Sequence, residues 1–159
     1  MELAYKQDWE QTKQRYRTWW AHEAVGRAAI AVTAPRDDPP PIAQPPRPAT
    51  PEQYWTDLDY MSAVSEYRIA RTFFGGEAFP LWGHGYPGNK SLGVFLGCPI
   101  NLAFDTGWID PLLAGEDIDC SRVGLDEDEP HFQFTLRWLR RCARDAAGKA
   151  VAGVGAFGG

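Results

Sequence analysis

Hydrophobic and polar positions follow helical spacing in some segments of the chain and form short apolar runs in others. Between residues 5 and 24, aromatic side chains recur at helical spacing among Gln, Lys and Arg, which predicts a helix. Residues 130–147 predict a second strong helix, with Phe134, Trp138 and Leu139 available for its buried side. The short apolar runs predict strands at residues 28–34, 79–83, 99–104 and 150–156.

Proline and glycine mark the boundaries between these segments. Residues 35–51 hold eight prolines and predict a long, extended surface loop. Thr50 and Pro51 are typical of a helix start, and the helical pattern that follows, residues 52–74, ends at two glycines. Residues 91–96 predict a short helix, and residues 112–128 are acidic and irregular. Helices and strands that alternate in this way predict an α/β fold with a parallel sheet.

The last predicted strand, residues 150–156, lies almost at the end of the sequence. A fold seldom finishes on a central strand that nothing covers. We therefore expect residues 1–159 to be the front part of a larger domain, with residues 35–51 as a loop inside it.

Composition narrows the classes of function. The chain has 159 residues, a net charge of −5, a pI near 5.2 and no basic stripe with interleaved aromatic residues, so nucleic acid is not an expected partner. No apolar run approaches the roughly 20 residues that span a membrane, and residues 1–11 lack the apolar core of a signal peptide. Cys98, Cys120 and Cys142 are widely spaced, which predicts free thiols and a cytoplasmic location.

The richest candidate chemistry follows the predicted strand 79–83. His84 lies between two glycines, which permit close approach of the backbone, and an imidazole there could act as an acid, a base or a ligand. Trp82, Tyr86 and Asn89 share this loop, and their flat rings and amide suit either a ring-shaped ligand or the packing of a barrel mouth. The alternative for His84 is a hydrogen bond to a neighbouring loop.

A second polar and aromatic cluster contains Asp105 and Trp108. Asp105 could bind substrate or orient His84 if the two loops meet, or it could simply fix its own Asp-Thr-Gly turn. Asp105 and Asp110 could also be read as a glycosidase carboxylate pair, which requires a defined separation that the sequence does not give. The dispersed His and Cys residues have no zinc spacing, so no metal site is expected in these residues.

Several segments together resemble the N-terminal part of the uroporphyrinogen decarboxylase-like superfamily. They are YWTD at residues 54–57, FFGGEAFP at residues 73–80 with the loop that follows to GVFLG, FDTGWIDP at residues 104–111, and VGAFGG at residues 154–159. This superfamily consists of (β/α)8 barrels and includes the decarboxylase itself and methyltransferases that act on corrinoid-bound methyl groups. The resemblance implies that the chain holds about three strand-helix units of an incomplete TIM barrel, whose full length is about 250 residues.

The sequence also departs from the pattern of the true decarboxylases. Where they carry arginines that grip the substrate carboxylates, this chain reads VTAPRDD, and Arg36 is the candidate cation. Where they place an Asp after the second strand, it reads LWGHGYPGN, and His84 is nearest. The methyltransferases bind zinc in the later half of their barrel, so no cofactor is expected in these residues, and the resemblance leaves open whether a full-length parent binds zinc and a corrinoid.

These departures favour corrinoid-linked methyl transfer over decarboxylation in the parent protein. His84 and Asp105 are the expected catalytic residues, and Trp82, Tyr86, Asn89, Trp108 and Arg36 are the expected substrate-binding residues. Two alternatives remain: a decarboxylase acting on a tetrapyrrole or another carboxylate, and a non-catalytic interaction module. In the second, an open sheet edge would favour self-association.

Overall fold

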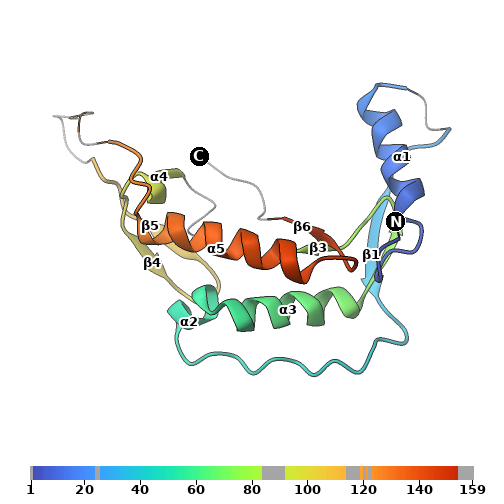
Figure 1. Ribbon diagram of the computed structural model, residues 1–159, viewed down its shortest axis with the longest axis horizontal. Coiled ribbons are helices and arrows are strands. Elements are labelled where there is room, and N and C mark those ends of the chain that lie inside the picture. The colour runs from blue at the N-terminus through green and yellow to red at the C-terminus, as the bar shows by residue number, and fades with distance from the viewer. Residues whose placement is uncertain are drawn as a thin grey trace.

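The computed structural model describes residues 2–23, 26–83, 92–113, 119, 121 and 123–153. Their helices and strands, in chain order, are α1 Trp9–Trp20, β1 Ala31–Pro35, α2 Pro51–Thr56, α3 Leu58–Ala70, β2 Thr72–Gly76, β3 Leu81–Trp82, α4 Leu92–Phe95, β4 Ile100–Leu102, β5 Gly107–Ile109, α5 Pro130–Asp145 and β6 Val151–Ala152. The two long helices α3 and α5 form the centre of the molecule (Figure 1). The β1–β2 ribbon and α1 lie at one end, and α4 with the β4–β5 hairpin lies at the other.

Helices α3 and α5 run side by side in the same direction (Figure 1). After each helix the chain turns back into a strand: α5 leads through Gly148 into β6, and α3 leads by way of β2 into β3. Strands β3 and β6 are parallel, with Leu81 opposite Val151 and Trp82 opposite Ala152. The other two sheets of the described residues, β1–β2 and β4–β5, are two-stranded and antiparallel, so the structure combines helices with small sheets.

The hydrophobic core lies between these helices and one face of the β3–β6 pair. Trp82, Met61, Trp138 and Cys142 are all 1% exposed or less. On the other face of β3, Leu81 is 56% exposed. Because side chains alternate along a strand, helices cover one face of this pair and leave the opposite face open within the described residues.

The first predicted strand and its pairing need correction. Strand β1 is exposed along its length, and it pairs antiparallel with β2, with Thr33 opposite Phe74, instead of forming a buried parallel strand. The segment predicted as a helix or a helix pair, residues 52–74, contains the pair α2 and α3, and its predicted end is wrong. Asp57 separates the two helices, because its carboxylate accepts hydrogen bonds from the backbone N–H groups of the next helix and so begins α3. The last part of that segment is β2, where Thr72 and two phenylalanines suit a strand.

Other predicted boundaries are confirmed. Thr50 caps α2, its hydroxyl oxygen accepting a hydrogen bond from the N–H of Gln53 at 3.2 Å. The predicted strand 99–104 contains β4, although β4 pairs antiparallel with β5, which was not predicted. The proline-rich loop is extended, and Arg47 from this loop lies 3.8 Å from the ring centroid of Phe104. No helix in the described part of the chain is long and apolar enough to cross a membrane.

Candidate functional site

The predicted site residues fall into three separate places. His84, Tyr86 and Asn89 lie outside the described residues. The loop that carries them begins at Gly83, directly after β3. The described chain stops at Gly83 and resumes at Leu92, the first residue of α4.

Trp82 is a core residue in this structure. Its side chain is 1% exposed and packs on the helix-covered face of β3, and the Lys149 ammonium lies 5.1 Å from its ring centroid. Among the described residues its indole N–H has no hydrogen-bond acceptor. Contact between Trp82 and a substrate therefore stays a prediction, whereas the structure shows directly that Trp82 packs in the hydrophobic core.

Asp105 and Trp108 both lie on the β4–β5 hairpin, at the molecular surface. Asp105 is exposed in the turn, which the Ala103 N–H closes by donating to the carbonyl of Thr106 at 2.8 Å. Trp108 is 70% exposed on β5. The two residues are thus close in the fold, as predicted for one cluster, but Asp110 is engaged locally by the Asn101 amide at 2.9 Å.

Arg36 does not join this cluster. It follows β1, and its backbone N–H donates to the carbonyl of Arg71 at 2.9 Å. The β1–β2 ribbon and the β4–β5 hairpin lie at opposite ends of α3 (Figure 1). The structure therefore separates Arg36 from Asp105 and Trp108.

A cavity of about 360 Å³ lies between the β1–β2 ribbon, α3 and β3, and we call it the β3 pocket. Its lining combines one guanidinium, three hydroxyls and several apolar side chains: Thr33, Ser65, Arg68, Ile69, Thr72, Phe74, Phe79, Leu81 and Gly83. The hydroxyls of Ser65 and Thr72 donate to backbone carbonyls of α3, which leaves their oxygens able to accept. An anionic group on a largely apolar ligand suits this mixture of side chains.

Gly83, the residue that precedes His84 in the sequence, forms part of the wall of the β3 pocket. Sequence reasoning identified this loop but missed Arg68, Ser65 and Thr72. Those three residues lie in or just after a helix whose pattern indicates only packing. The signal that could have found Arg68 is its position one turn before β2, from which the chain leads into β3 and the residues with candidate chemistry.

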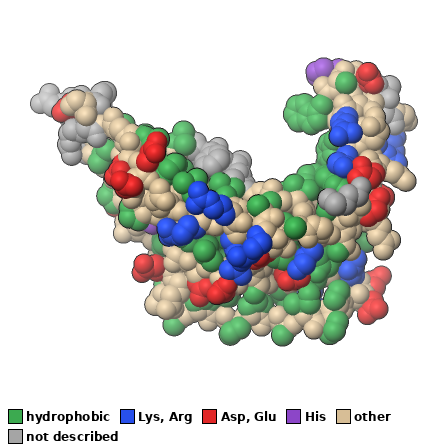
Figure 2. Space-filling view, in the orientation of Figure 1, with side chains coloured by type: hydrophobic (Ala, Val, Ile, Leu, Met, Phe, Trp, Pro, Cys, Tyr) green, Lys and Arg blue, Asp and Glu red, His purple; other side chains and the backbone are tan. Residues whose placement is uncertain are grey.

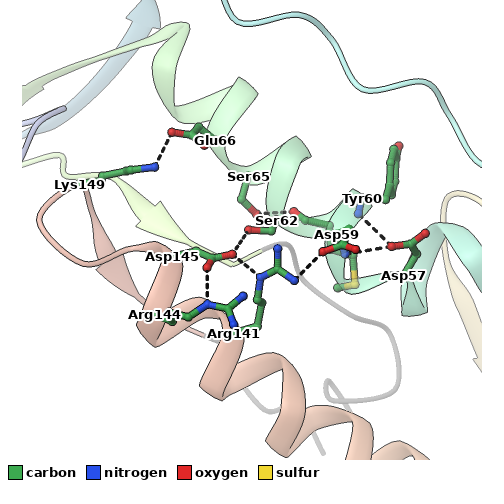
Figure 3. Close-up of polar contacts among 11 residues, drawn as sticks. Asp57, Asp59, Tyr60, Ser62, Ser65, Glu66, Arg141, Arg144, Asp145 and Lys149 are labelled. Carbon is green, nitrogen blue, oxygen red and sulfur yellow. Dashed lines mark hydrogen bonds and ion pairs between the residues drawn. The ribbon is translucent and has the colours of Figure 1, made fainter.

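A polar network links α3 to α5 (Figure 3). Arg141 Nη1 donates to Asp59 at 2.6 Å and its Nε donates to Asp145, while the Ser62 hydroxyl donates to Asp145 at 2.6 Å. Burial opposes ionisation of Asp145, yet these hydrogen bonds, with one from Arg144, lower its pKa to about 2. Lys149 donates to Glu66 at 2.7 Å and completes the link. A carboxylate with so low a pKa is a weak base at neutral pH, so the network suits helix packing better than acid-base catalysis.

Two further buried ionisable groups have structural surroundings. Burial raises the pKa of the Cys142 thiol to about 12, which suppresses the reactive thiolate. Glu77 is 1% exposed and is held by Arg27, by Arg15 and by the N–H of Ile30. The hydrogen bonds from Arg27 lead the causes that lower its pKa to about 2. Both groups are therefore fixed in one protonation state near neutral pH.

No group of three or more His, Cys, Asp or Glu side chains in the described ranges is arranged to hold a metal ion. The chain matches no protein-family model, no curated protein and no solved structure at a significant level. The assignment of function therefore depends on the residues and their geometry.

Proposed function

We propose that this chain contributes strand-helix units to an α/β-barrel enzyme of the uroporphyrinogen decarboxylase-like kind, with corrinoid-linked methyl transfer as the reaction of the full-length parent. The observation that supports this proposal most strongly is the parallel β3–β6 pair, with α3 and α5 on one face and the other face open. In a (β/α)8 barrel, helices cover only the outer face of the sheet, and ligands bind at the C-terminal ends of the strands.

In this proposal the ligand enters beside Gly83 and places an anionic group in the β3 pocket. Arg68 then has the carboxylate-binding role that the sequence suggested for Arg36, because Arg68 and Gly83, which precedes His84 in the sequence, line the same cavity. His84 acts as the acid or base, and Asp105 and Trp108 of the β4–β5 hairpin contact the part of the ligand that lies farthest from the β3 pocket. Tyr86 and Asn89 contact the ring system of the ligand. Free thiols at Cys98 and Cys142 are consistent with a cytoplasmic enzyme.

Methyl transfer from methylcobalamin to a thiol, in the presence of zinc, tests this function on the product of the complete gene. The expected result is turnover that His84→Ala and Asp105→Asn each reduce at least about tenfold. His22→Asn and Asp110→Asn are matched controls and should retain activity. Asn suits position 22 because His22 has a positive φ of 58°. Decarboxylation of a porphyrinogen without any methyl transfer would favour the decarboxylase alternative.

A non-catalytic interaction module is the second candidate, and exposed apolar side chains favour it. Trp20 is 71% exposed, Trp108 70%, Leu81 56% and Phe73 53%. Single exposed apolar residues are common, but strand faces such as those of Phe73 and Leu81 are frequent contact surfaces. Size-exclusion chromatography with light scattering at several concentrations separates the candidates. A monomer of 17.8 kDa at all concentrations would argue against the module.

A further inference from the structure

One face of α1 carries aromatic and basic side chains in alternating order. Trp9, Lys13, Tyr16 and Trp20 recur at intervals of three or four residues, and Arg17 lies four residues after Lys13 and three before Trp20, so the five share one side of the helix. Phe79, which follows β2 in the chain, packs against this side: its ring centroid lies 5.2 Å from that of Trp9 and 5.8 Å from that of Tyr16. Figure 2 shows hydrophobic and basic side chains next to each other on the arm that α1 forms.

These six side chains line a cleft of about 400 Å³, which we call the α1 cleft. The volume falls within the range of small-molecule sites, roughly 300–1,000 Å³. The cleft lies apart from the β3 pocket, although Phe79 contributes to the wall of both. Its four rings offer flat apolar surfaces, of which Trp20, at 71% exposed, is the most accessible.

The walls of the cleft are fixed in place. The Tyr16 hydroxyl donates to the carbonyl of Glu77 at 2.9 Å, and Glu77 is itself bound by two arginines. Trp20 packs edge-on against Trp19, with ring centroids 4.8 Å apart. A ligand that enters this cleft therefore meets rings that are already positioned, which lowers the entropic cost of binding.

The charge of the cleft is opposite to that of the whole chain. Lys13 and Arg17 line it and no carboxylate does, whereas the chain has a net charge of −5. Lys13 is paired with Glu10 at 2.9 Å and lies 5.7 Å from the Trp9 ring centroid. No described residue forms an ion pair with Arg17, so its guanidinium is the group that can bind an anion. Arginine also stacks on flat rings while it binds a carboxylate or sulfonate.

We propose that the α1 cleft is a binding site for a small planar aromatic anion, such as an aromatic carboxylate or sulfonate. The ring system lies against Trp20 and Phe79, and the acid group pairs with Arg17. The charge of the cleft selects an anion, and its volume selects a small molecule over an extended polymer. This site shares Phe79 with the wall of the β3 pocket, and it uses no residue to which the proposed methyl transfer assigns a role.

A pair of fluorescent probes tests the proposal. The probe 8-anilinonaphthalene-1-sulfonate carries an aromatic ring system and one sulfonate, and N-phenyl-1-naphthylamine has the same rings without the charge. We expect the sulfonate probe to bind the intact chain saturably, at one molecule per chain. Arg17→Gln should weaken the sulfonate probe about three- to fivefold and leave the neutral probe unchanged. Trp20→Ala should weaken both probes about tenfold.

The chain supplies a matched control for each variant. Arg140→Gln removes one exposed positive charge from α5, and Trp108→Ala removes a tryptophan of almost equal exposure, 70% against 71%. Neither control should change the affinity for either probe. Circular dichroism of each variant verifies that the fold is retained. Equal loss of affinity in Arg17→Gln and Arg140→Gln, or no saturable binding at all, would overturn the proposal. Self-association that Trp20→Ala abolishes would also overturn it, because the cleft would then be an interface between two copies of the chain.

Discussion

At the residue scale, the carboxylate of Glu77 is the group with the most concentrated set of interactions. It is 1% exposed and accepts hydrogen bonds from Arg27 at 2.6 and 2.9 Å, from Arg15 at 3.1 Å and from the N–H of Ile30 at 2.7 Å. These donors come from α1 and from the segment that leads into β1. One side chain therefore holds the N-terminal part of the described chain against the end of β2.

Replacement of this carboxylate should destabilise the fold strongly. Glu77→Gln keeps the shape of the side chain but removes the charge that pairs with two partly exposed arginines, and hydrogen bonds to a charged group contribute about 1.5–3 kcal/mol. We expect a loss of that size in the free energy of unfolding at pH 7, measured by urea denaturation. Glu66→Gln is the control, because Glu66 pairs with Lys149 at a partly exposed site and should cost less than about 1 kcal/mol. Equal losses in the two variants would contradict this assignment.

The low pKa of Glu77 also predicts how stability depends on pH. Folding lowers the pKa from the ordinary value of 4.5 to about 2, chiefly through hydrogen bonds from Arg27, so the folded state binds fewer protons than the unfolded state in that interval. The stabilisation is therefore complete above pH 4.5 and is lost as the pH falls toward 2. Urea midpoints between pH 6 and 2.5 should decline steeply in the natural chain and less steeply in Glu77→Gln. Parallel curves would show that Glu77 is not responsible.

At the scale of single elements, glycine controls how β3 pairs with β6. Gly83 has a φ of 148°, and a Cβ atom at this position would lie 1.9 Å from the carbonyl oxygen of Gly153. The N–H of Gly153 donates to the carbonyl of Trp82 at 3.0 Å, so the two backbone segments approach closely at this point. The absence of a side chain is what permits the approach.

Gly83→Ala should therefore break this end of the β3–β6 pair. We expect a loss of at least about 2 kcal/mol, seen as a lower melting temperature by circular dichroism. Gly97→Ala separates steric overlap from backbone strain, because Gly97 also has a positive φ, 94°, but nothing lies within 4 Å of its added Cβ. It should cost less than Gly83→Ala. If both variants lose the same stability, the close approach to Gly153 is not the cause.

The sequence predicted elements well where local signals decide them. Residues 130–147 contain α5, and Thr50 with Pro51 begins α2, because caps and helical periodicity depend on near neighbours in the chain. The pairing of β1 with β2 was missed because it depends on contacts between distant residues. In the sequence, residues 72–76 continue a segment with a helical pattern. Only their pairing with β1 shows that they form a strand. In the same way, the chain pattern grouped Asp105 with Trp108 but could not show that Arg36 lies far from both.

At the scale of the whole molecule, the buried core is uneven. The residues of the main cluster, among them Trp55, Met61, Trp82 and Trp138, come chiefly from α2, α3, α5 and β3. The β4–β5 hairpin contributes partly buried side chains, and Trp55 ties it down by donating from its indole N–H to the carbonyl of Ala103 at 2.6 Å. Regions with few buried contacts open at lower free energy than the core, so the hairpin should open before the helices separate.

Hydrogen exchange of backbone amides can measure the difference in opening free energy between the β4–β5 hairpin and the helices. Trp138→Leu tests this difference directly. Trp138 is completely buried on α5, and the smaller side chain should remove about 2 kcal/mol by leaving a cavity. Amides of α3 and α5 that exchange only through global unfolding should lose protection by that full amount. Amides of the β4–β5 hairpin, which exchange by local opening, should change little. Uniform loss of protection along the chain would instead show that the hairpin unfolds only together with the core, and the hairpin that carries Asp105 and Trp108 would then be as stable as the core.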